Sequence, residues 1–440
     1  MTGLVMAAQL IAGLAILVTL HELGHYLAAR AFGIKVEKFY LFFDAWGVKL
    51  FSFKKGDTEY GIGWLPLGGY VKIAGMIDES MDKEAMKQEP QPWEFRSKPA
   101  WQRLIVMVAG VTMNVILGIL IYWFVTYKYG ESQLPISEIK YGLVASPIAE
   151  QIGISTGDKI IKVNGKKVKY FSDLLSAEVL MGNAVLTVVK NNNDTTDILV
   201  PADFIERFND DSDSRYVAPR QKFSVDKVVE GSNAERAGLQ NGDRILAVEN
   251  QQIEFFDELQ KALQENKGEE VKITLNRNNE VINKTVEVTT EGTIGFAPKM
   301  EEMIFENQTY GLGESFTIGA DKAFSSLFVT IKGLGKIFKG EVSASKSLHG
   351  PIGIAKIYGG EWDWYRFWVI TGLLSMVLAF MNILPIPALD GGHVMFLTAE
   401  AISGRKPSDN FMEKAQITGM IILLGLMAFA IGNDILKIFS

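Results

Sequence analysis

Four long apolar stretches, separated by polar segments, dominate the pattern of hydrophobic and polar positions along the chain. Each approaches or exceeds the roughly 20 residues that a helix needs to cross a bilayer. A buried helix of a soluble protein would explain one such stretch, but it is a poor explanation for four. We therefore predict four membrane-spanning helices, over about residues 4–28, 104–127, 367–390 and 415–433.

The basic residues that flank these spans predict the orientation of the chain. Lys and Arg are frequent near the span ends within residues 29–103 and 391–414, and basic flanks favour the cytoplasm. We therefore place these two segments inside the cell and residues 128–366 outside. The first span lacks both a basic amino-terminal region and a small-residue cleavage site, so we expect it to be retained rather than removed as a signal peptide.

Residues 128–300 are polar and contain an internal duplication. The stretch "AEQIGISTGDKIIKVNGKKVKYFSDL" matches "AERAGLQNGDRILAVENQQIEFFDEL", with the Gly-Asp pairs 157–158 and 242–243 in register. Each copy reads as a short helix, a Gly-Asp turn, an alternating strand and a further helix. We therefore predict two small α+β domains, residues 128–215 and 216–300.

Both copies resemble PDZ domains of the bacterial protease type. The resemblance implies a groove that takes an extended peptide segment or a peptide C-terminus by strand addition. A spacer that binds no peptide, or that only blocks access, is the alternative for either copy.

A linker, residues 301–365, joins the duplication to the carboxy-terminal membrane part, residues 366–440. Within it, Asp321 to Gly340 alternates lysines with apolar residues at helical spacing. This pattern predicts an amphipathic helix on the membrane surface. An ordinary helix that packs on the outer domains is the alternative.

The composition excludes some chemistry. The formal net charge is −7, and no basic surface indicates a nucleic-acid partner. The chain contains no cysteine, so it has neither disulfides nor thiolate metal ligands. Any transition-metal site must therefore use carboxylates and the four histidines.

The end of the first apolar stretch carries the motif "HELGH", residues 21–25. His21 and His25 lie four residues apart, on one face of a helix, and both can therefore reach one Zn2+ ion. Glu22 beside them can act as a general base on metal-bound water. Two histidines that pair only with polar neighbours are the alternative, which is hard to sustain in a bilayer.

Asp390 is the predicted third ligand, because a catalytic zinc usually has three protein ligands and one water. The first and third spans run in the same direction, which places Asp390 at the same depth as His21 and His25. His393 competes for this role. We prefer Asp390, because we expect Gly391 and Gly392 to turn the chain away before His393.

HExxH in the first span, "NILPIPALDG" in a later span and PDZ copies between them resemble the site-2 protease family of intramembrane metalloproteases. The resemblance covers nearly the whole chain. It implies a bacterial inner-membrane zinc peptidase that cuts single-span membrane proteins within or near the lipid bilayer. Typical substrates would be anti-sigma factors already trimmed outside by another protease, with remnant signal peptides as a further class.

The same resemblance implies a substrate-binding role for Asn382, Pro385 and Pro387. Asn382 would hold the substrate backbone, and the prolines would break the third helix where it lines a cavity. For Asn382, a hydrogen bond between helices is the alternative. The segment "AGVTMN", Ala109 to Asn114, resembles a further pattern of the family. In this chain Val111 stands where that pattern has a proline, so the roles of Gly110 and Asn114 stay open.

Residues Tyr60 to Gly75 alternate and end in a Gly-rich segment. Similar family members have a membrane-associated β-hairpin here, within about residues 35–76. An edge near Gly68, Gly69 and Tyr70 would clamp an extended substrate by strand addition. A hairpin that only seals the site is the alternative.

The predicted fold is thus a multi-span α-helical membrane protein with two inserted PDZ-like α+β domains and a membrane-associated β-hairpin, the amino-terminal membrane part being residues 1–127. Two other functions compete with the peptidase. A non-catalytic PDZ scaffold would need neither Glu22 nor Asp390. A zinc transporter would need further His or carboxylate ligands inside the other spans, which the sequence does not offer.

Overall fold

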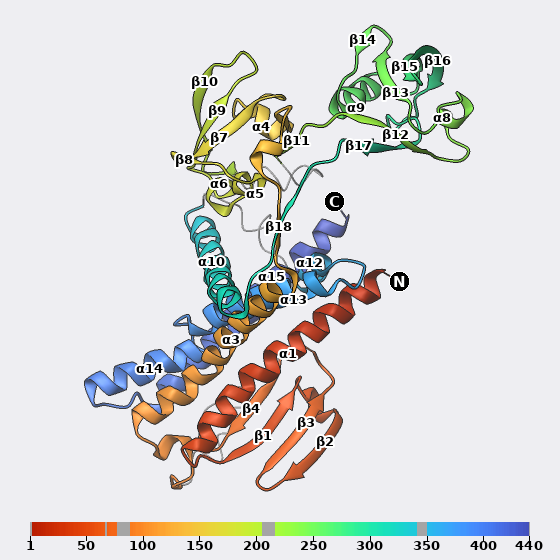
Figure 1. Cartoon of the computed structure of the whole chain (residues 1–440). Coiled ribbons are helices and arrows are strands. Elements are labelled where there is room, and N and C mark those ends of the chain that lie inside the picture. The colour runs from red at the N-terminus through yellow and green to blue at the C-terminus, as the bar shows by residue number, and fades with distance from the viewer. Residues whose placement is uncertain (1, 67, 77–88, 205–215, 341–349, 440) are drawn as a thin grey trace. The chain divides into compact units, whose positions relative to one another are not determined.

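A computed structural model of the chain divides into two compact units (Figure 1). One unit comprises Met1–Glu131 together with Thr309–Ser440, and the other comprises Ser132–Gln308. The structure describes residues 2–66, 68–76, 89–204, 216–340 and 350–439.

Four long helices form the membrane part: α1 (Thr2–Ala31), α3 (Ala100–Tyr129), α13 (Trp364–Ile383) and α15 (Asp409–Phe439). Each is long and apolar enough to cross a membrane. The helices α1 and α13 both lie against α3 (Figure 1). The prediction of four spans is confirmed.

The third span ends earlier than the sequence predicted. Helix α13 stops at Ile383, and Leu384 is already extended. Leu384 precedes Pro385, and a residue before proline is pushed from helical to extended geometry. Asp390 therefore does not belong to the span but begins a separate helix, α14 (Asp390–Ser403).

A four-stranded sheet stands where the sequence indicated a β-hairpin. Its strands are β1 (Val36–Leu41), β2 (Lys49–Lys55), β3 (Thr58–Gly63) and β4 (Tyr70–Ile73), in the order β2-β3-β1-β4. Strand β1 is parallel to β3 and antiparallel to β4. The strands of the 60–75 segment therefore pair with β1 instead of each other, and β4 lies at the edge of the sheet.

Two further contacts hold the membrane unit together around α3. Helix α10 (Leu312–Phe338) includes residues 321–338 of the predicted amphipathic segment. It packs on α3, with Gly319 against the backbone of Trp123. The amphipathic pattern did not predict this close packing. The guanidinium of Arg103 in α3 pairs with Glu400 in α14 at 2.5 Å. A short helix, α12 (Pro351–Tyr358), precedes α13.

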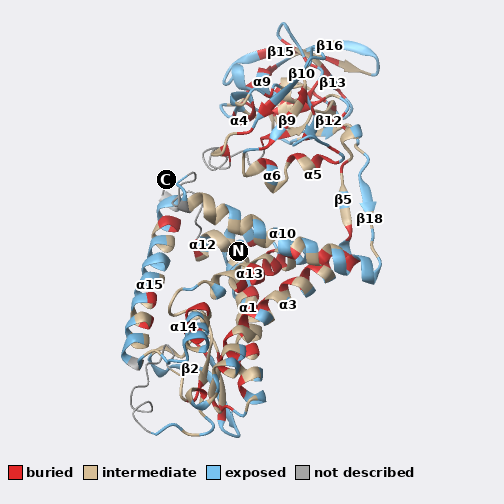
Figure 2. Cartoon of the chain, turned by 90° about the vertical axis from the view of Figure 1, so that its left-hand side faces the viewer, coloured by how far each residue is buried: buried red, intermediate tan, exposed pale blue. Residues whose placement is uncertain are grey.

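The second unit contains two copies of one pattern, each with its own hydrophobic core. The sheet orders are β10-β9-β7-β8 in the first copy and β14-β13-β15-β16 in the second. The duplicated sequences form corresponding elements in both copies, and Figure 2 shows buried residues in their strands. The first copy contains β6 (Leu143–Ala145), α4 (Pro147–Gln151), β7 (Lys159–Val163), β8 (Lys166–Lys167), α5 (Phe171–Leu174), α6 (Ala177–Leu180), β9 (Val185–Val189), β10 (Thr195–Leu199) and β11 (Val217–Pro219).

The second copy follows the same order. Strand β12 pairs with β17, as β6 pairs with β11 in the first copy. A separate two-stranded sheet is formed by β5 (Glu131–Gln133) and β18 (Glu306–Gln308). The second copy contains β12 (Phe223–Val228), α8 (Asn233–Arg236), β13 (Arg244–Val248), β14 (Gln251–Gln252), α9 (Phe256–Glu265), β15 (Glu270–Arg277), β16 (Glu280–Glu287) and β17 (Phe296–Met300).

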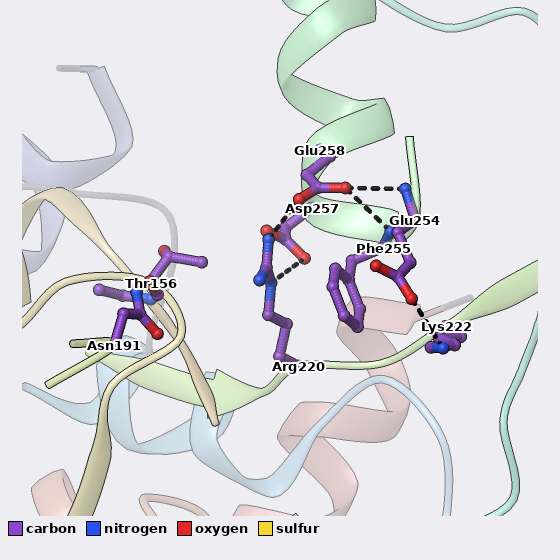
Figure 3. A network of polar contacts seen from close by, with 9 residues as sticks. Thr156, Asn191, Arg220, Lys222, Glu254, Phe255, Asp257 and Glu258 are labelled. Carbon is purple, nitrogen blue, oxygen red and sulfur yellow. Dashed lines mark hydrogen bonds and ion pairs between the residues drawn. The ribbon is translucent and has the colours of Figure 1, made fainter. Parts of the chain in front are cut away.

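A polar network fixes the segment before β12 to the start of α9 (Figure 3). Arg220 donates to both carboxylate oxygens of Asp257 at 3.2 Å and to Glu258 at 2.6 Å. Its guanidinium also lies 4.0 Å from the ring centre of Phe255. Lys222 pairs with Glu254 at 2.7 Å. Arg220 and Lys222 therefore both have acidic partners. The sequence alone did not reveal these pairs.

The aspartates of the two Gly-Asp pairs are both buried, and each binds a basic side chain of its own copy. Asp243 is fully buried and accepts two hydrogen bonds from Arg277, both at 2.7 Å. Burial opposes its ionisation, but the hydrogen bonds from Arg277 and from the backbone of Gln240 outweigh it and lower the pKa of Asp243. Asp158 accepts from Lys190 at 2.8 Å.

We predict that Asp243→Asn lowers the free energy of unfolding of the second copy by about 2 kcal/mol, because it removes a two-point, charge-assisted interaction. Asp158→Asn is the matched control in the other copy and should cost less, since Lys190 donates a single hydrogen bond to Asp158. Urea-dependent proteolysis of the detergent-solubilised chain measures both.

The stabilisation by Asp243 should be complete at neutral pH. It should shrink as the pH falls below about 4, the ordinary aspartate value, toward the lower folded pKa. Equal losses in the two copies at neutral pH would contradict this account.

Candidate metal centre

Three side chains from distant parts of the sequence meet at one point of the membrane unit. His21 and His25 lie in α1, and Asp390 begins α14. Asp390 Oδ2 is 3.2 Å from His21 Nε2 and 3.3 Å from His25 Nε2, and the two Nε2 atoms are 3.2 Å apart. The structure therefore brings together the three residues that the sequence analysis selected.

Hydrogen bonds at the far side of each imidazole hold both rings in place. His25 Nδ1 donates to the backbone carbonyl of Val106 at 2.8 Å, which leaves Nε2 with its lone pair toward the cluster. His21 Nδ1 lies 3.2 Å from the side-chain nitrogen of Asn114. Asn114 Oδ1 is buried without a partner among the described residues. Turning the Asn114 carboxamide by 180° lets Oδ1 accept from His21 Nδ1–H and satisfies both groups.

Glycines on α1 and α3 make this arrangement possible. A Cβ at Gly110 would overlap both imidazoles, and a Cβ at Gly24 would lie 2.5 Å from the carbonyl oxygen of Ala109. The two helices therefore approach closely only because these positions lack side chains. The motif that left Gly110 and Asn114 unexplained thus supplies the space and the second support for the histidines.

The donor set fits a zinc ion. Two imidazole nitrogens and one carboxylate oxygen converge within 4.8 Å of one another. Asp390 Oδ2 is buried and makes no hydrogen bond within the described part of the chain, so it stays available as a ligand. Nitrogen and carboxylate ligands suit zinc, and three protein ligands leave a position open for water or substrate.

A cavity of about 540 Å³ opens onto this cluster. Among the predicted site residues, Glu22, Asn382, Gly68, Gly69 and Tyr70 line it together with the three clustered residues. Pro385 and Pro387 do not line the cavity but lie in the link between α13 and α14. The side-chain nitrogen of Asn382 is 3.4 Å from His21 Nε2.

The position of His393 corrects one sequence-based argument. Gly391 and Gly392 do not turn the chain away but form the first turn of α14 with Asp390 and His393. Their small size has a different reason, since a Cβ at Gly391 would overlap the carbonyls at the end of α13. His393 lines the cavity and yet is not part of the three-residue cluster.

The edge strand β4 runs along the same cavity. Residues 70–73 all line it, and the backbone of Val71 approaches the carboxylate of Glu22. Tyr70 donates to Asp44 Oδ1 at 2.8 Å, and Lys38 pairs with Asp44 Oδ2 at 3.2 Å. Burial and the hydrogen bond to Asp44 raise the pKa of Tyr70, so its hydroxyl stays protonated. Asp44 and Lys38 carry no recognisable sequence signal and were missed.

The profile of Peptidase family M50 matches residues 9–426 of the chain. The chain belongs to peptidase family M50. The regulator of sigma E protease of Haemophilus influenzae is 32% identical over 97% of this chain and 98% of its own length. Protease RseP of Yersinia pestis is 30% identical over 97% of both chains. A Pasteurella multocida protein whose name describes a zinc metalloprotease is 32% identical over 98% of both.

This M50 peptidase is therefore a multi-pass membrane zinc metalloprotease related to the RseP group. Family membership, together with an intact Glu22 and the clustered His21, His25 and Asp390, favours the enzyme over the scaffold and the transporter. The sequence-based prediction of a zinc-dependent enzyme is confirmed.

We predict that Asn114→Leu weakens zinc binding by the peptidase about 10- to 100-fold, because loss of the group that hydrogen-bonds the outer nitrogen of a histidine ligand has effects of this size. Asn114→Asp keeps an acceptor for His21 Nδ1–H and should retain most of the affinity. Competition with a chromogenic chelator measures both. Full zinc affinity in Asn114→Leu would contradict the role assigned to Asn114.

Proposed function

We propose that this M50 peptidase cleaves single-span membrane proteins within or near the bilayer, as a step of regulated intramembrane proteolysis. Anti-sigma-factor-type proteins, shortened beforehand by another protease, are the proposed substrates, and remnant signal peptides are a further class. The observation that carries the proposal is the cluster of His21, His25 and Asp390, with Glu22, in a cavity of the membrane unit. The similarity to the regulator of sigma E protease and to RseP supports the substrate class.

In this proposal, His21, His25 and Asp390 hold the zinc ion, which supplies Lewis-acid activation of water and of the scissile carbonyl. Glu22 follows His21 directly in α1 and lines the same cavity. Its carboxylate accepts the proton of the attacking water and delivers it to the leaving amine. The backbone of Val71 in β4 lies near that carboxylate.

The substrate must be extended before it can be cut, because a helix ties up its carbonyls in hydrogen bonds four residues apart. Among the described strands, β4 is an edge strand of its sheet, and Gly68, Gly69 and residues 70–73 line the cavity. Strand addition to this edge would hold an unwound segment next to Glu22. The network of Tyr70, Asp44 and Lys38 supports the start of the strand.

Asn382 would contact the substrate main chain. Its nitrogen now lies against His21 Nε2, but the lone pair of that atom serves one partner at a time. When Nε2 ligates a metal, the Asn382 carboxamide is released to another partner in the cavity. Pro385 and Pro387 would act indirectly, since they end α13 and thereby place Asp390.

The proposed location is the bacterial inner membrane, with the zinc site toward the cytoplasm and residues 132–308 on the outer side. The two PDZ-like copies would then act as a size gate, or dock peptide C-termini and extended segments. Basic residues near the ends of α1 and α3, such as Arg30 and Arg103, support this orientation.

We predict that Glu22→Gln abolishes cleavage of a single-span test substrate in proteoliposomes, with a loss of at least about 100-fold, because the variant lacks the general base. Zinc content should be unchanged, since Glu22 is not a ligand. Mass spectrometry of the products and metal analysis of the same preparations measure both. Equal cleavage by the variant would end the peptidase mechanism as stated.

We predict that Lys72→Cys in β4, combined with Glu22→Gln to trap the substrate, forms disulfides with single cysteines at every second position of the substrate. A strand presents alternate residues to one side, whereas a helix repeats every three to four. The chain has no cysteine of its own, so the background is clean. A helical repeat would contradict strand addition.

A further inference from the structure

The last membrane helix contributes a polar side chain to the zinc cavity that the proposed chemistry leaves without a task. Most of α15 is apolar and exposed on the surface of the unit (Figure 2), as expected for a helix that faces lipid. Gln416 differs from the exposed apolar residues of α15, since it is polar, only 5% exposed, and lines the cavity. Polar groups at this depth need partners.

Close packing brings Gln416 to the site. Gly419 lies three residues further on, and therefore on the same face of α15. A Cβ at Gly419 would overlap the backbone of Pro387, so α15 packs directly on the link that leads to Asp390. This contact places Gln416 next to the segment that carries the third ligand.

The Gln416 carboxamide makes no hydrogen bond with the described residues, although carboxamides in membrane helices commonly join helices in this way. The other two carboxamides of the cavity, Asn114 and Asn382, both contact His21. The Gln416 carboxamide therefore has its hydrogen-bonding capacity available to a molecule in the cavity.

We propose that Gln416 binds the main chain of the unwound substrate, an inference that rests on the proposed function. A substrate bound as a strand has two edges, and β4 can pair with the amide and carbonyl groups of only one of them. The groups on the other edge of the substrate strand would have no main-chain partner in β4. A carboxamide donates and accepts at once and therefore matches a peptide group at two points.

The contact is to the main chain, so it favours an extended segment of any sequence. Gln416 thus selects unwound over helical substrate, because the groups it binds are occupied in a helix. Its loss should affect different substrates to a similar extent.

The test compares Gln416→Met with the wild type in proteoliposomes, on two single-span substrates whose residues around the cleavage site differ. Methionine keeps the length of the side chain and removes its hydrogen bonds. We expect kcat/KM to fall about 10-fold for both substrates, equivalent to about 1.4 kcal/mol. Zinc content and the thermal unfolding temperature should not change. Thr418→Val is the control on the same helix, because Thr418 donates to the carbonyl of Lys414 within α15.

A second measurement does not depend on turnover. Gln416→Cys, combined with Glu22→Gln, should form a disulfide with a substrate cysteine near the cleavage site, whereas Ile421→Cys on the exposed side of α15 should not. Unchanged kcat/KM in Gln416→Met, a loss accompanied by zinc depletion or unfolding, or absence of the Gln416→Cys crosslink would each overturn the inference. Cleavage by Glu22→Gln alone would instead refute the proposed function, so the two failures are distinguishable.

Discussion

The close approach of α1 and α3 is the constraint on which the site depends. A membrane helix gains little from bringing polar groups together unless their hydrogen bonds are satisfied inside the protein. Gly24 and Gly110 remove the side chains that would keep the two backbones apart. The carbonyl of Val106 and the carboxamide of Asn114 then reach the outer nitrogens of His25 and His21. Both imidazoles therefore turn their Nε2 atoms toward one point.

The third ligand depends on an interruption of the helix rather than on its continuation. Proline at position 385 ends α13, and the chain restarts as α14 with Asp390 as its first residue. Gly391 lets this restart pack tightly against the end of α13, and the ion pair between Arg103 and Glu400 ties α14 to α3. One helix thus carries two ligands, and a break between two others supplies the third.

The sequence predicted the parts of this picture that have a local signal. Apolar length predicted the four spans, and "HELGH" with its i, i+4 histidines predicted the metal cluster. Asp390 was selected because a catalytic zinc needs a third ligand and because the parallel first and third spans place it at the depth of His21 and His25. The duplicated Gly-Asp pattern predicted two similar α+β copies.

The remaining features arise from contacts between distant segments. Asn114 has no signal of its own until α3 is placed beside His21, and the role of Gly110 depends on the same packing. The pairing of β1 between β3 and β4 follows from long-range contacts, which alternation alone cannot specify. His393 was ruled out as a ligand because two glycines suggested a turn, whereas these glycines allow tight packing on the end of α13 and on the link that follows it. The free carboxamide of Gln416 became visible only with α15 in place.

X-ray absorption at the zinc edge of the purified, zinc-loaded protein tests the central claim most directly. The account predicts two imidazole ligands and a carboxylate oxygen, a spectrum unchanged by His393→Ala, and loss of zinc in Asp390→Asn. Three imidazoles that fall to two in His393→Ala, or full zinc content in Asp390→Asn, would contradict it.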